Sequence, residues 1–333
     1  MNRESIALIG YGYWGKKLYR YLKDDPTFDC RKIFFRSLKQ LSDLERIERF
    51  GEEFVTDPAS IWEDKSIKSV ILATPIETHF SLGKKALLAG KNLLIEKPLA
   101  LSRAEAISLS KLARKRDLVV LTDYIYTFSR SLQKAREEIA SGTIGKVRGL
   151  YLSIRQIGRF LPHNVYWLLA SHLLAVLDMF TPLGELDFQR DDLIGEGEAA
   201  ETGLIRFRTR ADGFAGCIDV SLNFPGKEKQ IVIYGDKGSI IYLPDRPPAL
   251  RVVCYRKLRG TPADELVIGH QEYDYDEANN IRLLLARFAD CLRGEREDNL
   301  ERAIAVTTVL EKLSRGKLCY PSLPEEFSCA CPG

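Results

Sequence analysis

Short apolar runs alternate with segments of helical periodicity in the first third of the chain. The apolar runs occupy residues 5–10, 30–37, 69–75, 92–98 and 118–124. Segments whose apolar residues recur at helical spacing lie at residues 15–23, 38–50, 78–90 and 102–116. Strands that alternate with helices in this way predict right-handed crossovers and a parallel, doubly wound α/β sheet.

A different pattern begins after about residue 123. A helix is predicted over residues 129–142, a strand over 146–158, and a second helix within the apolar segment 167–180, which contains His172. Segments typical of strands then follow one another without helices, at residues 200–209, 214–224, 229–235, 238–243 and 249–257. This succession predicts a large, mainly antiparallel sheet in an α+β arrangement. Two helices follow, near 276–293 and 299–314, with Gly294 as a C-cap and Asn299 as an N-cap.

The length of 333 residues exceeds what one hydrophobic core usually supports. We therefore predict two domains, an α/β domain over residues 1–122 and an α+β domain over residues 123–333. The 49 basic and 46 acidic residues are interleaved and leave a net charge of +3, which gives no reason to expect a nucleic-acid partner. The apolar run around His172 is too short to span a bilayer, and the N-terminus lacks a signal-peptide pattern, so we expect no membrane association and a cytoplasmic location.

Seven scattered cysteines, an odd number, are typical of reduced thiols rather than of a disulfide framework. Cys329 and Cys331 form a C-x-C pair near the C-terminus, but no second ligand pair or nearby histidine accompanies them. We therefore predict no metal site.

A complete G-x-G-x-x-G motif lies between the first predicted strand and the first predicted helix. Gly10 permits a tight turn, Gly12 lets the backbone approach a pyrophosphate, and Gly15 allows the helix to pack closely on the strand. Tyr13 and Trp14 lie between the last two glycines, where the helix begins and its amide groups face an anion. In this context the motif predicts a dinucleotide-binding site that includes all five residues.

The end of the second predicted strand indicates which dinucleotide is bound. NAD-binding chains usually place Asp or Glu there, to accept hydrogen bonds from the ribose 2′-hydroxyl. This chain has Arg36, Ser37 and Lys39 instead, and a guanidinium group pairs well with a 2′-phosphate. We therefore favour NADP(H) as the cofactor and keep NAD(H) as the alternative. The other interpretation of Arg36 and Lys39 is that they are ordinary surface charges at the start of a helix.

Two further loops follow strands of the same predicted sheet. Thr74 and Pro75 end one apolar run, and Glu96, Lys97 and Pro98 end the next. Because ligands of open α/β sheets bind at the carboxyl ends of the strands, we expect both loops to lie at the cofactor crevice. Pro98 restricts the backbone beside Lys97 and helps to fix where its ammonium group points.

The glycine-rich turn, the stretch ATPIETHF and the stretch ALLAGKNLLIEKPLA together resemble the Gfo/Idh/MocA oxidoreductases, over residues 5 to about 120. The resemblance implies that Lys97 lies beside the nicotinamide and the substrate carbonyl as a catalytic residue. It also implies that Glu96 and His79 lie near the cofactor, and that the peptide bond between Lys97 and Pro98 is often cis.

The second domain resembles sugar-acting members of that family, especially those using nucleotide-linked sugars. The residues that agree with the family pattern are Gly158, Arg159, Phe160, Trp167 and His172. His172 falls on the family's catalytic histidine, whereas a lone histidine in an apolar helix is otherwise more often a core residue. Leu168 and Leu173 stand where the family has aspartates, which makes a sugar pocket less certain.

The predicted function is hydride transfer between NAD(P) and a carbonyl or carbinol carbon of a sugar or nucleotide sugar. Lys97 polarises the substrate oxygen, and His172 or Lys97 transfers the proton. The predicted substrate contacts are Lys97, Tyr124, Arg155, Arg159, Trp167 and His172. Packing is the alternative for Tyr124, and an exposed position on the sheet is the alternative for the two arginines.

Two other functions fit the same fold. Relatives in this family reduce imines, including thiazoline-type rings in siderophore biosynthesis, and other members are non-catalytic dinucleotide sensors. The presence of both Lys97 and His172 argues against a sensor, which needs neither residue. By the same resemblance we expect a homodimer or homotetramer formed through the C-terminal sheet.

Overall fold

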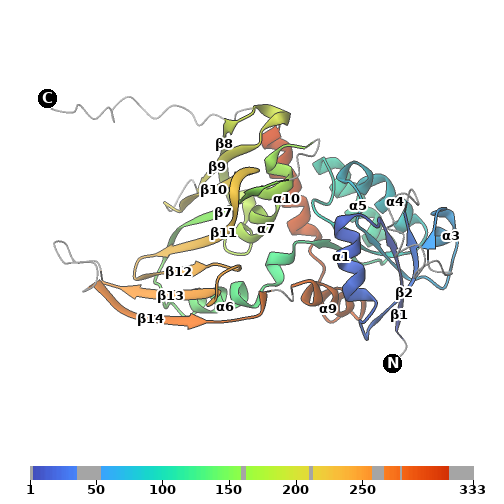
Figure 1. The fold of residues 1–333 in the computed structure, drawn as a ribbon, viewed down its shortest axis with the longest axis horizontal. Helices are drawn as coiled ribbons and strands as arrows, with labels where there is room; N and C mark the ends of the chain where they lie inside the picture. Colours follow the sequence, from blue (N-terminus) through green and yellow to red (C-terminus); the bar gives the residue numbers. More distant parts are fainter. Residues whose placement is uncertain are drawn as a thin grey trace. The chain divides into compact units, whose positions relative to one another are not determined.

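A computed structural model describes residues 3–35, 54–158, 163–209, 213–256, 266–277 and 280–314 of the chain. Two compact units make up this chain (Figure 1). The first takes its described residues from within 1–133 and 276–308, and the second from within 134–275 and 309–314. The chain passes between the units three times: inside α6 (Arg130–Ala140), between Tyr275 and Asp276, and inside α10 (Leu300–Ser314).

The first unit alternates strands and helices, as the apolar pattern predicts. Its elements are β1 (Glu4–Ile9), α1 (Tyr13–Leu22), β2 (Phe28–Phe34), β3 (Phe54–Val55), α3 (Ala59–Trp62), β4 (Ser69–Leu72), η2 (Ile76–Thr78), α4 (His79–Leu88), β5 (Asn92–Glu96), α5 (Arg103–Lys115), β6 (Val120–Asp123), η3 (Ile125–Phe128) and α9 (Asn280–Leu292). The six strands among the described residues form one sheet in the order β3-β2-β1-β4-β5-β6, and every recorded pair is parallel. This order is that of a doubly wound dinucleotide-binding sheet, with its switch point between β1 and β4.

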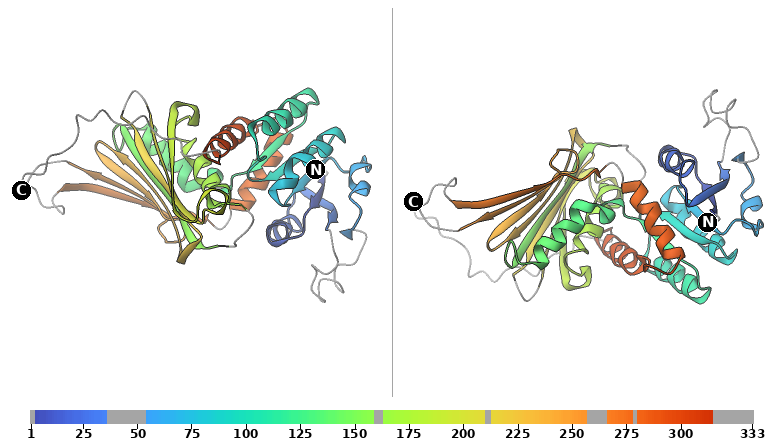
Figure 2. Two further views of the ribbon diagram at one scale, coloured as in Figure 1. Left: turned by 90° about the horizontal axis from the view of Figure 1, so that it is seen from above. Right: turned by 90° about the horizontal axis from the view of Figure 1, so that it is seen from below.

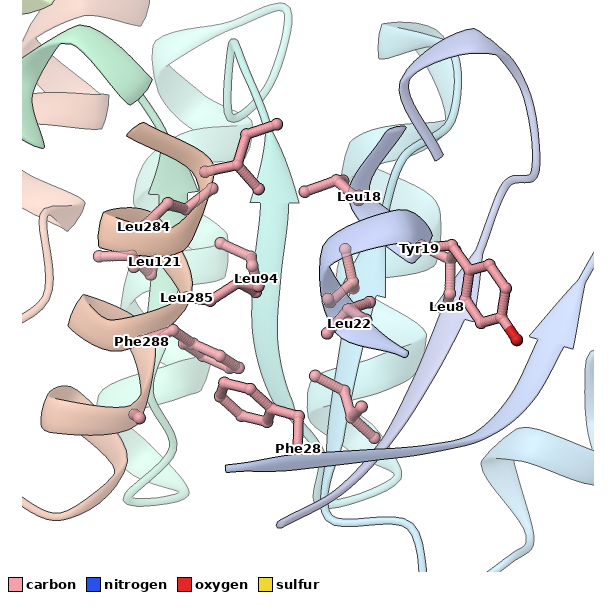
Figure 3. Packing of buried hydrophobic residues seen from close by; sticks show 14 of the residues in the cluster. Leu8, Leu18, Tyr19, Leu22, Phe28, Leu94, Leu121, Leu284, Leu285 and Phe288 are labelled. Carbon is pink, nitrogen blue, oxygen red and sulfur yellow. The ribbon is translucent and has the colours of Figure 1, made fainter. Parts of the chain in front are cut away.

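The core of the first unit includes a helix from far along the chain. Ile281, Leu284, Leu285 and Phe288 of α9 are at most 3% exposed and pack with residues of α1, β1, β2 and the central strands. The Phe288 ring stacks on Phe28 with centroids 5.9 Å apart (Figure 3). The predicted boundary at residue 122 assigned this helix to the second domain, whereas the helix packs in the core of the first unit.

Two caps frame the link between α9 and α10. Gly294 follows α9 with a φ of +72°, a backbone conformation that favours glycine. Asn299 precedes α10, and its carbonyl accepts from the Ala303 amide at 2.9 Å. Its side chain instead binds strand β6: Oδ1 accepts from the Thr122 amide and Nδ2 donates to the Thr122 carbonyl, both at 2.7 Å. Asn299 therefore extends the hydrogen bonding of β6.

The second unit is built on a large sheet. Its elements are β7 (Val147–Ile157), the π-helical turn η4 (Tyr166–Ala170), α7 (Ser171–Leu177), η5 (Leu183–Glu185), β8 (Leu186–Ile194), η6 (Gly197–Ala199), β9 (Thr202–Thr209), β10 (Ala215–Ser221), β11 (Asn223–Gly235), β12 (Gly238–Tyr242), β13 (Leu250–Tyr255) and β14 (Val267–Tyr273). Eight described strands run in the order β14-β13-β12-β11-β7-β10-β9-β8. All recorded pairs are antiparallel except β7 with β10, which is parallel.

Helices cover one face of this sheet. Figure 2 shows α6 and α7 on the same side of the long strands. Along β7, Leu150, Leu152 and Ile154 are buried, and alternate residues of a strand share a face. Tyr151 and Arg155 lie on the opposite face, where both contact Asp219 of β10, at 3.0 and 3.7 Å. The expected oligomer through this sheet stays a prediction.

The structure confirms the predicted fold class and most of the predicted elements. The pattern missed β3, α3, β8 and β14, and the π-helical turn before α7. Six of the seven residues of β14 are exposed, so its pattern lacks the alternating burial that identifies a half-buried strand. No helix among the described residues is long and apolar enough to cross a membrane.

Candidate active site at the carboxyl edge of the parallel sheet

The glycine-rich turn between β1 and α1 is shaped by its backbone. Gly10 has a φ of +101°, and a Cβ atom there would lie 2.3 Å from the Ala73 carbonyl oxygen. A Cβ at Gly15 would lie 1.9 Å from the Gly10 carbonyl oxygen. At Gly12, by contrast, a Cβ would meet no described atom within 4 Å. The turn is therefore tightly packed at Gly10 and Gly15 and open at Gly12.

The start of α1 fits an anionic ligand. Gly12 is its N-cap, no side chain caps the helix there, and its first turn contains no acidic residue. The amide groups at a helix N-terminus attract phosphate. The open space at Gly12 is where a pyrophosphate approaches in this kind of turn. These residues fit a dinucleotide.

Trp14 and Tyr13 differ in their surroundings. Trp14 is partly buried, and its indole Nε1 donates to Asp123 Oδ2 at 3.0 Å, which ties α1 to the end of β6. Tyr13 is 64% exposed. Lys17 lies over the Trp14 ring, 4.8 Å from its centroid. Trp14 of the motif thus binds the end of β6, and the start of the helix offers backbone amide donors.

Glu96, Lys97 and Asp123 form a cluster at the ends of β5 and β6. Glu96 and Asp123 are direct partners in the parallel register, and each carboxyl group has one buried oxygen that no donor among the described residues reaches. Burial raises the pKa of Asp123 to about 6, and it raises the pKa of Glu96 well above its usual range, with the Asp123 charge adding to the effect. Burial also lowers the pKa of Lys97, while the two carboxyl groups oppose that shift. The peptide bond between Lys97 and Pro98 is cis.

His79 connects the two loops of this edge. Its ring is 1% exposed, with Nδ1 2.8 Å from the Pro98 carbonyl oxygen and Nε2 2.9 Å from that of Thr74. Burial lowers the pKa of His79, so the ring is neutral and donates from one nitrogen. The Thr74 hydroxyl accepts from Thr78 at 2.8 Å, and Pro75 is exposed. The structure therefore places His79 as a link between the loops, and its contact with a cofactor stays a prediction.

His172 is set apart from the other residues of its helix. The other six residues of α7 are buried, and His172 is partly exposed. The helix continues directly from the π-helical turn η4, and π-helical turns occur often at functional sites. A core histidine would be buried, whereas the side chain of His172 is partly accessible to solvent. His172 belongs to the second unit and Lys97 to the first, and their convergence stays a prediction.

Trp167 is anchored on the turn before His172. The side chain is 5% exposed, and its indole Nε1 donates to the Ser314 hydroxyl at 2.9 Å. The Trp167 amide donates to Asn164 Oδ1 at 3.2 Å. These bonds fix the start of the His172 helix. Leu173 is 2% exposed, so this position, which is acidic in the family pattern, belongs to the core here.

The remaining predicted substrate contacts lie in different surroundings. Arg155 donates to Glu228 at 2.8 Å, and its guanidinium group lies 4.9 Å from the centroid of the Phe224 ring. Tyr124 is 1% exposed and follows β6 directly. Four predicted ligand contacts lie outside the described residues: Arg36, Ser37, Lys39 and Arg159.

A family model for oxidoreductases with an NAD-binding Rossmann fold, GFO_IDH_MocA, matches residues 5–124. Over these residues the chain is similar to the Gfo/Idh/MocA oxidoreductase family. Levoglucosan dehydrogenase of Pseudarthrobacter phenanthrenivorans is 25% identical to this chain in an alignment 302 positions long that covers 76% of each chain. Myo-inositol 2-dehydrogenase of Thermotoga maritima is 25% identical in an alignment 254 positions long that covers 71% of this chain and 74% of the relative.

Solved structures share the fold of this chain over nearly its whole length. KijD10, a 3-ketoreductase of Actinomadura kijaniata solved with TDP-benzene and NADP, superposes with a TM-score of 0.79 at 17% identity and covers 95% of this chain and 98% of its own. GenD2 from gentamicin A biosynthesis, solved with NAD, gives a TM-score of 0.77 at 22% identity and covers 95% of both chains.

Asp123 is a residue of this site that the sequence pattern did not single out. The signal was present, because Asp123 is the last residue of a buried strand at the carboxyl edge where ligands bind. The pattern could not show which residues Asp123 contacts, because Glu96 and Trp14 lie 27 and 109 positions away from it along the chain. Only the strand order brings the three residues together.

Proposed function

We propose that the chain transfers a hydride between a nicotinamide cofactor and a carbonyl or carbinol carbon of a sugar or nucleotide sugar. The observation that carries the proposal is the position of Lys97 directly after β5, at the same sheet edge as the open glycine turn. The family and the sugar-acting relatives support this substrate class. Neither an imine reductase nor a dinucleotide sensor is favoured by these relatives.

Lys97 and His172 both act on the substrate oxygen, by polarising it and by transferring a proton. The bound nicotinamide supplies or accepts the hydride. In reduction, the ammonium group of Lys97 polarises the carbonyl, and His172 or Lys97 donates the proton to the nascent alkoxide. In oxidation, one of the two accepts the hydroxyl proton. Burial lowers the pKa of Lys97, which brings the amine closer to exchanging a proton near neutral pH.

The proposal retains the other predicted cofactor and substrate contacts. Gly10, Gly12, Tyr13, Trp14 and Gly15 hold the pyrophosphate side of the cofactor, and Thr74, Pro75 and Glu96 line the loops beyond it. Tyr124, Arg155, Arg159 and Trp167 stay predictions as substrate contacts. A cytoplasmic location likewise stays a prediction.

Replacing Lys97 tests the catalytic proposal. Turnover of NADPH or NADH is followed by absorbance with a panel of ketosugars and nucleotide-linked ketosugars. Lys97→Ala is expected to lower kcat by about 10²- to 10⁴-fold, because a positioned proton donor is worth about that much. It is expected to retain dinucleotide binding. Lys115→Ala, at an exposed position on α5, is the matched control. A Lys97→Ala variant with full activity contradicts the assignment.

Replacing Arg36 tests the cofactor proposal. We propose NADP(H) as the preferred cofactor, on the basis of Arg36, Ser37 and Lys39 in the sequence. Arg36→Ala is expected to weaken NADP binding by about 10- to 100-fold and to leave NAD binding nearly unchanged, because a hydrogen bond to a charged group is worth about 1.5–3 kcal/mol. Fluorescence titration measures both Kd values. Arg31→Ala, on exposed β2 surface, is the control. An unchanged ratio of the two Kd values contradicts the proposal.

A further inference from the structure

We propose that Glu96 and Asp123 are positioning residues for Lys97: their carboxyl groups share one proton and present a single negative charge to its ammonium group. The catalytic importance of this arrangement rests on the proposed function of Lys97. None of the proposed catalytic steps uses Asp123.

The register of the sheet brings the two carboxyl groups together. Glu96 ends β5, Asp123 ends β6, and the two residues are direct partners in the parallel ladder. Direct partners in a parallel ladder project their side chains from the same face of the sheet. Two ionised carboxylates are acceptors only, so a hydrogen bond between these two carboxyl groups requires a proton on one of them.

The surrounding donors show where that proton belongs. The Trp14 indole donates to Asp123 Oδ2 at 3.0 Å, and the Lys97 amide donates to Glu96 Oε2 at 3.3 Å. Glu96 Oε1 and Asp123 Oδ1 are both buried, and no donor among the described residues reaches either atom. A shared proton satisfies the two remaining oxygens.

Charge balance supports one proton rather than none or two. Two adjacent buried carboxylates repel each other, whereas two neutral acids would provide no negative charge for the Lys97 ammonium group. One shared proton gives a pair with charge −1 beside a cation of charge +1. Two other titratable groups face the cluster: Lys17 of α1 acts on Asp123, and His79 of α4, neutral because of its burial, lies near Lys97.

Amide variants test whether Glu96 and Asp123 carry one negative charge between them or act as two separate charges. In Glu96→Gln or Asp123→Asn, the new amide donates an N–H where the proton lay, and the other residue keeps one negative charge. The double variant Glu96→Gln/Asp123→Asn removes that charge. The titration of Lys97 is read by NMR of isotope-labelled lysine, with the signal assigned through Lys97→Met. This measurement needs no turnover.

Each single variant is expected to keep the pKa of Lys97 within about half a unit of wild type, and the double variant to lower it by more than about one unit. Glu301→Gln, whose wild-type side chain is 89% exposed, is the control and is expected to change nothing. The proposal is overturned if either single variant lowers the pKa as much as the double, because each carboxylate then acts separately. An unchanged pKa in the double variant also overturns it.

A second measurement covers a double variant that does not fold. Carboxyl ¹³C NMR of the wild type is expected to show the pair losing its two protons in two widely separated steps, and Asp123→Asn to reduce this to a single step. Two overlapping steps near pH 4 in the wild type contradict the shared proton. Failure to turn over any sugar would refute the proposed function and leave both titrations readable.

Discussion

Gly10 and Gly12 lie two positions apart in one turn, yet a methyl group would meet different surroundings at each. At Gly10 it would press on the Ala73 carbonyl and demand a positive φ from a non-glycine residue. At Gly12 it would enter open space. Gly10 is therefore required by the fold. The fold does not require a glycine at position 12, where the open space is available to a ligand.

Gly12→Ala is expected to fold like the wild type and to bind NADP at least about tenfold more weakly, because the methyl group occupies the approach of the pyrophosphate. Thermal unfolding and fluorescence titration measure the two properties. Gly10→Ala is the comparison: it is expected to lower stability by about 1–3 kcal/mol through backbone strain. If Gly12→Ala binds NADP normally, the pyrophosphate does not lie at this turn.

Arg190 connects several elements of the second unit. It is 5% exposed and forms a bidentate pair with Asp192 of the same strand, at 2.6 and 2.9 Å. It also donates to the carbonyls of Leu313 in α10 and Gly197 in η6, and its guanidinium group lies 4.4 Å from the centroid of the Tyr166 ring. Tyr166 begins the π-helical turn that leads to His172. Arg190 thus holds the base of that helix.

Arg190→Met is expected to destabilise the second unit by about 3–5 kcal/mol, because it leaves the Asp192 carboxylate partly buried without its charge partner. The double variant Arg190→Met/Asp192→Leu is expected to lose less than the sum of the two single variants. Urea unfolding is followed by Trp167 fluorescence in a background with Trp14→Phe and Trp62→Phe. Additive losses in this cycle would show that the pair is not coupled.

At the scale of the whole chain, the first unit needs a segment from beyond residue 275. Ile281, Leu284, Leu285 and Phe288 bury their side chains in its core. Burial of a large apolar side chain is worth about 1.5–3 kcal/mol, so these four contribute about 6–12 kcal/mol before entropy costs. The total stability of a domain is about 5–15 kcal/mol.

A fragment of residues 1–133 is therefore expected to aggregate or remain unfolded. Joining residues 276–308 to it through a flexible linker is expected to restore a cooperative thermal transition. Near-ultraviolet circular dichroism distinguishes the two outcomes. A shorter fragment that unfolds cooperatively by itself would show that α9 is not needed for this core.

Local pattern was enough to predict most elements and part of the site. The alternation of apolar runs predicted β1, β4, β5 and β6, and the glycine spacing predicted the turn before α1. The Glu96, Lys97 and Pro98 stretch identified the second loop. These features follow from the sequence because strand burial, helical periodicity and glycine conformation act over a few neighbouring residues.

Tertiary structure decided what depends on distant partners. It paired Asp123 with Glu96 and Trp14, placed His79 between two carbonyls, and returned α9 to the core of the first unit. It also left His172 partly exposed on a helix whose other residues are buried. The sequence by itself determined which segments form strands and helices, because those choices are local. Only the tertiary structure decided which of these segments contact one another. Burial and charge interactions depend on residues that lie far apart in the sequence.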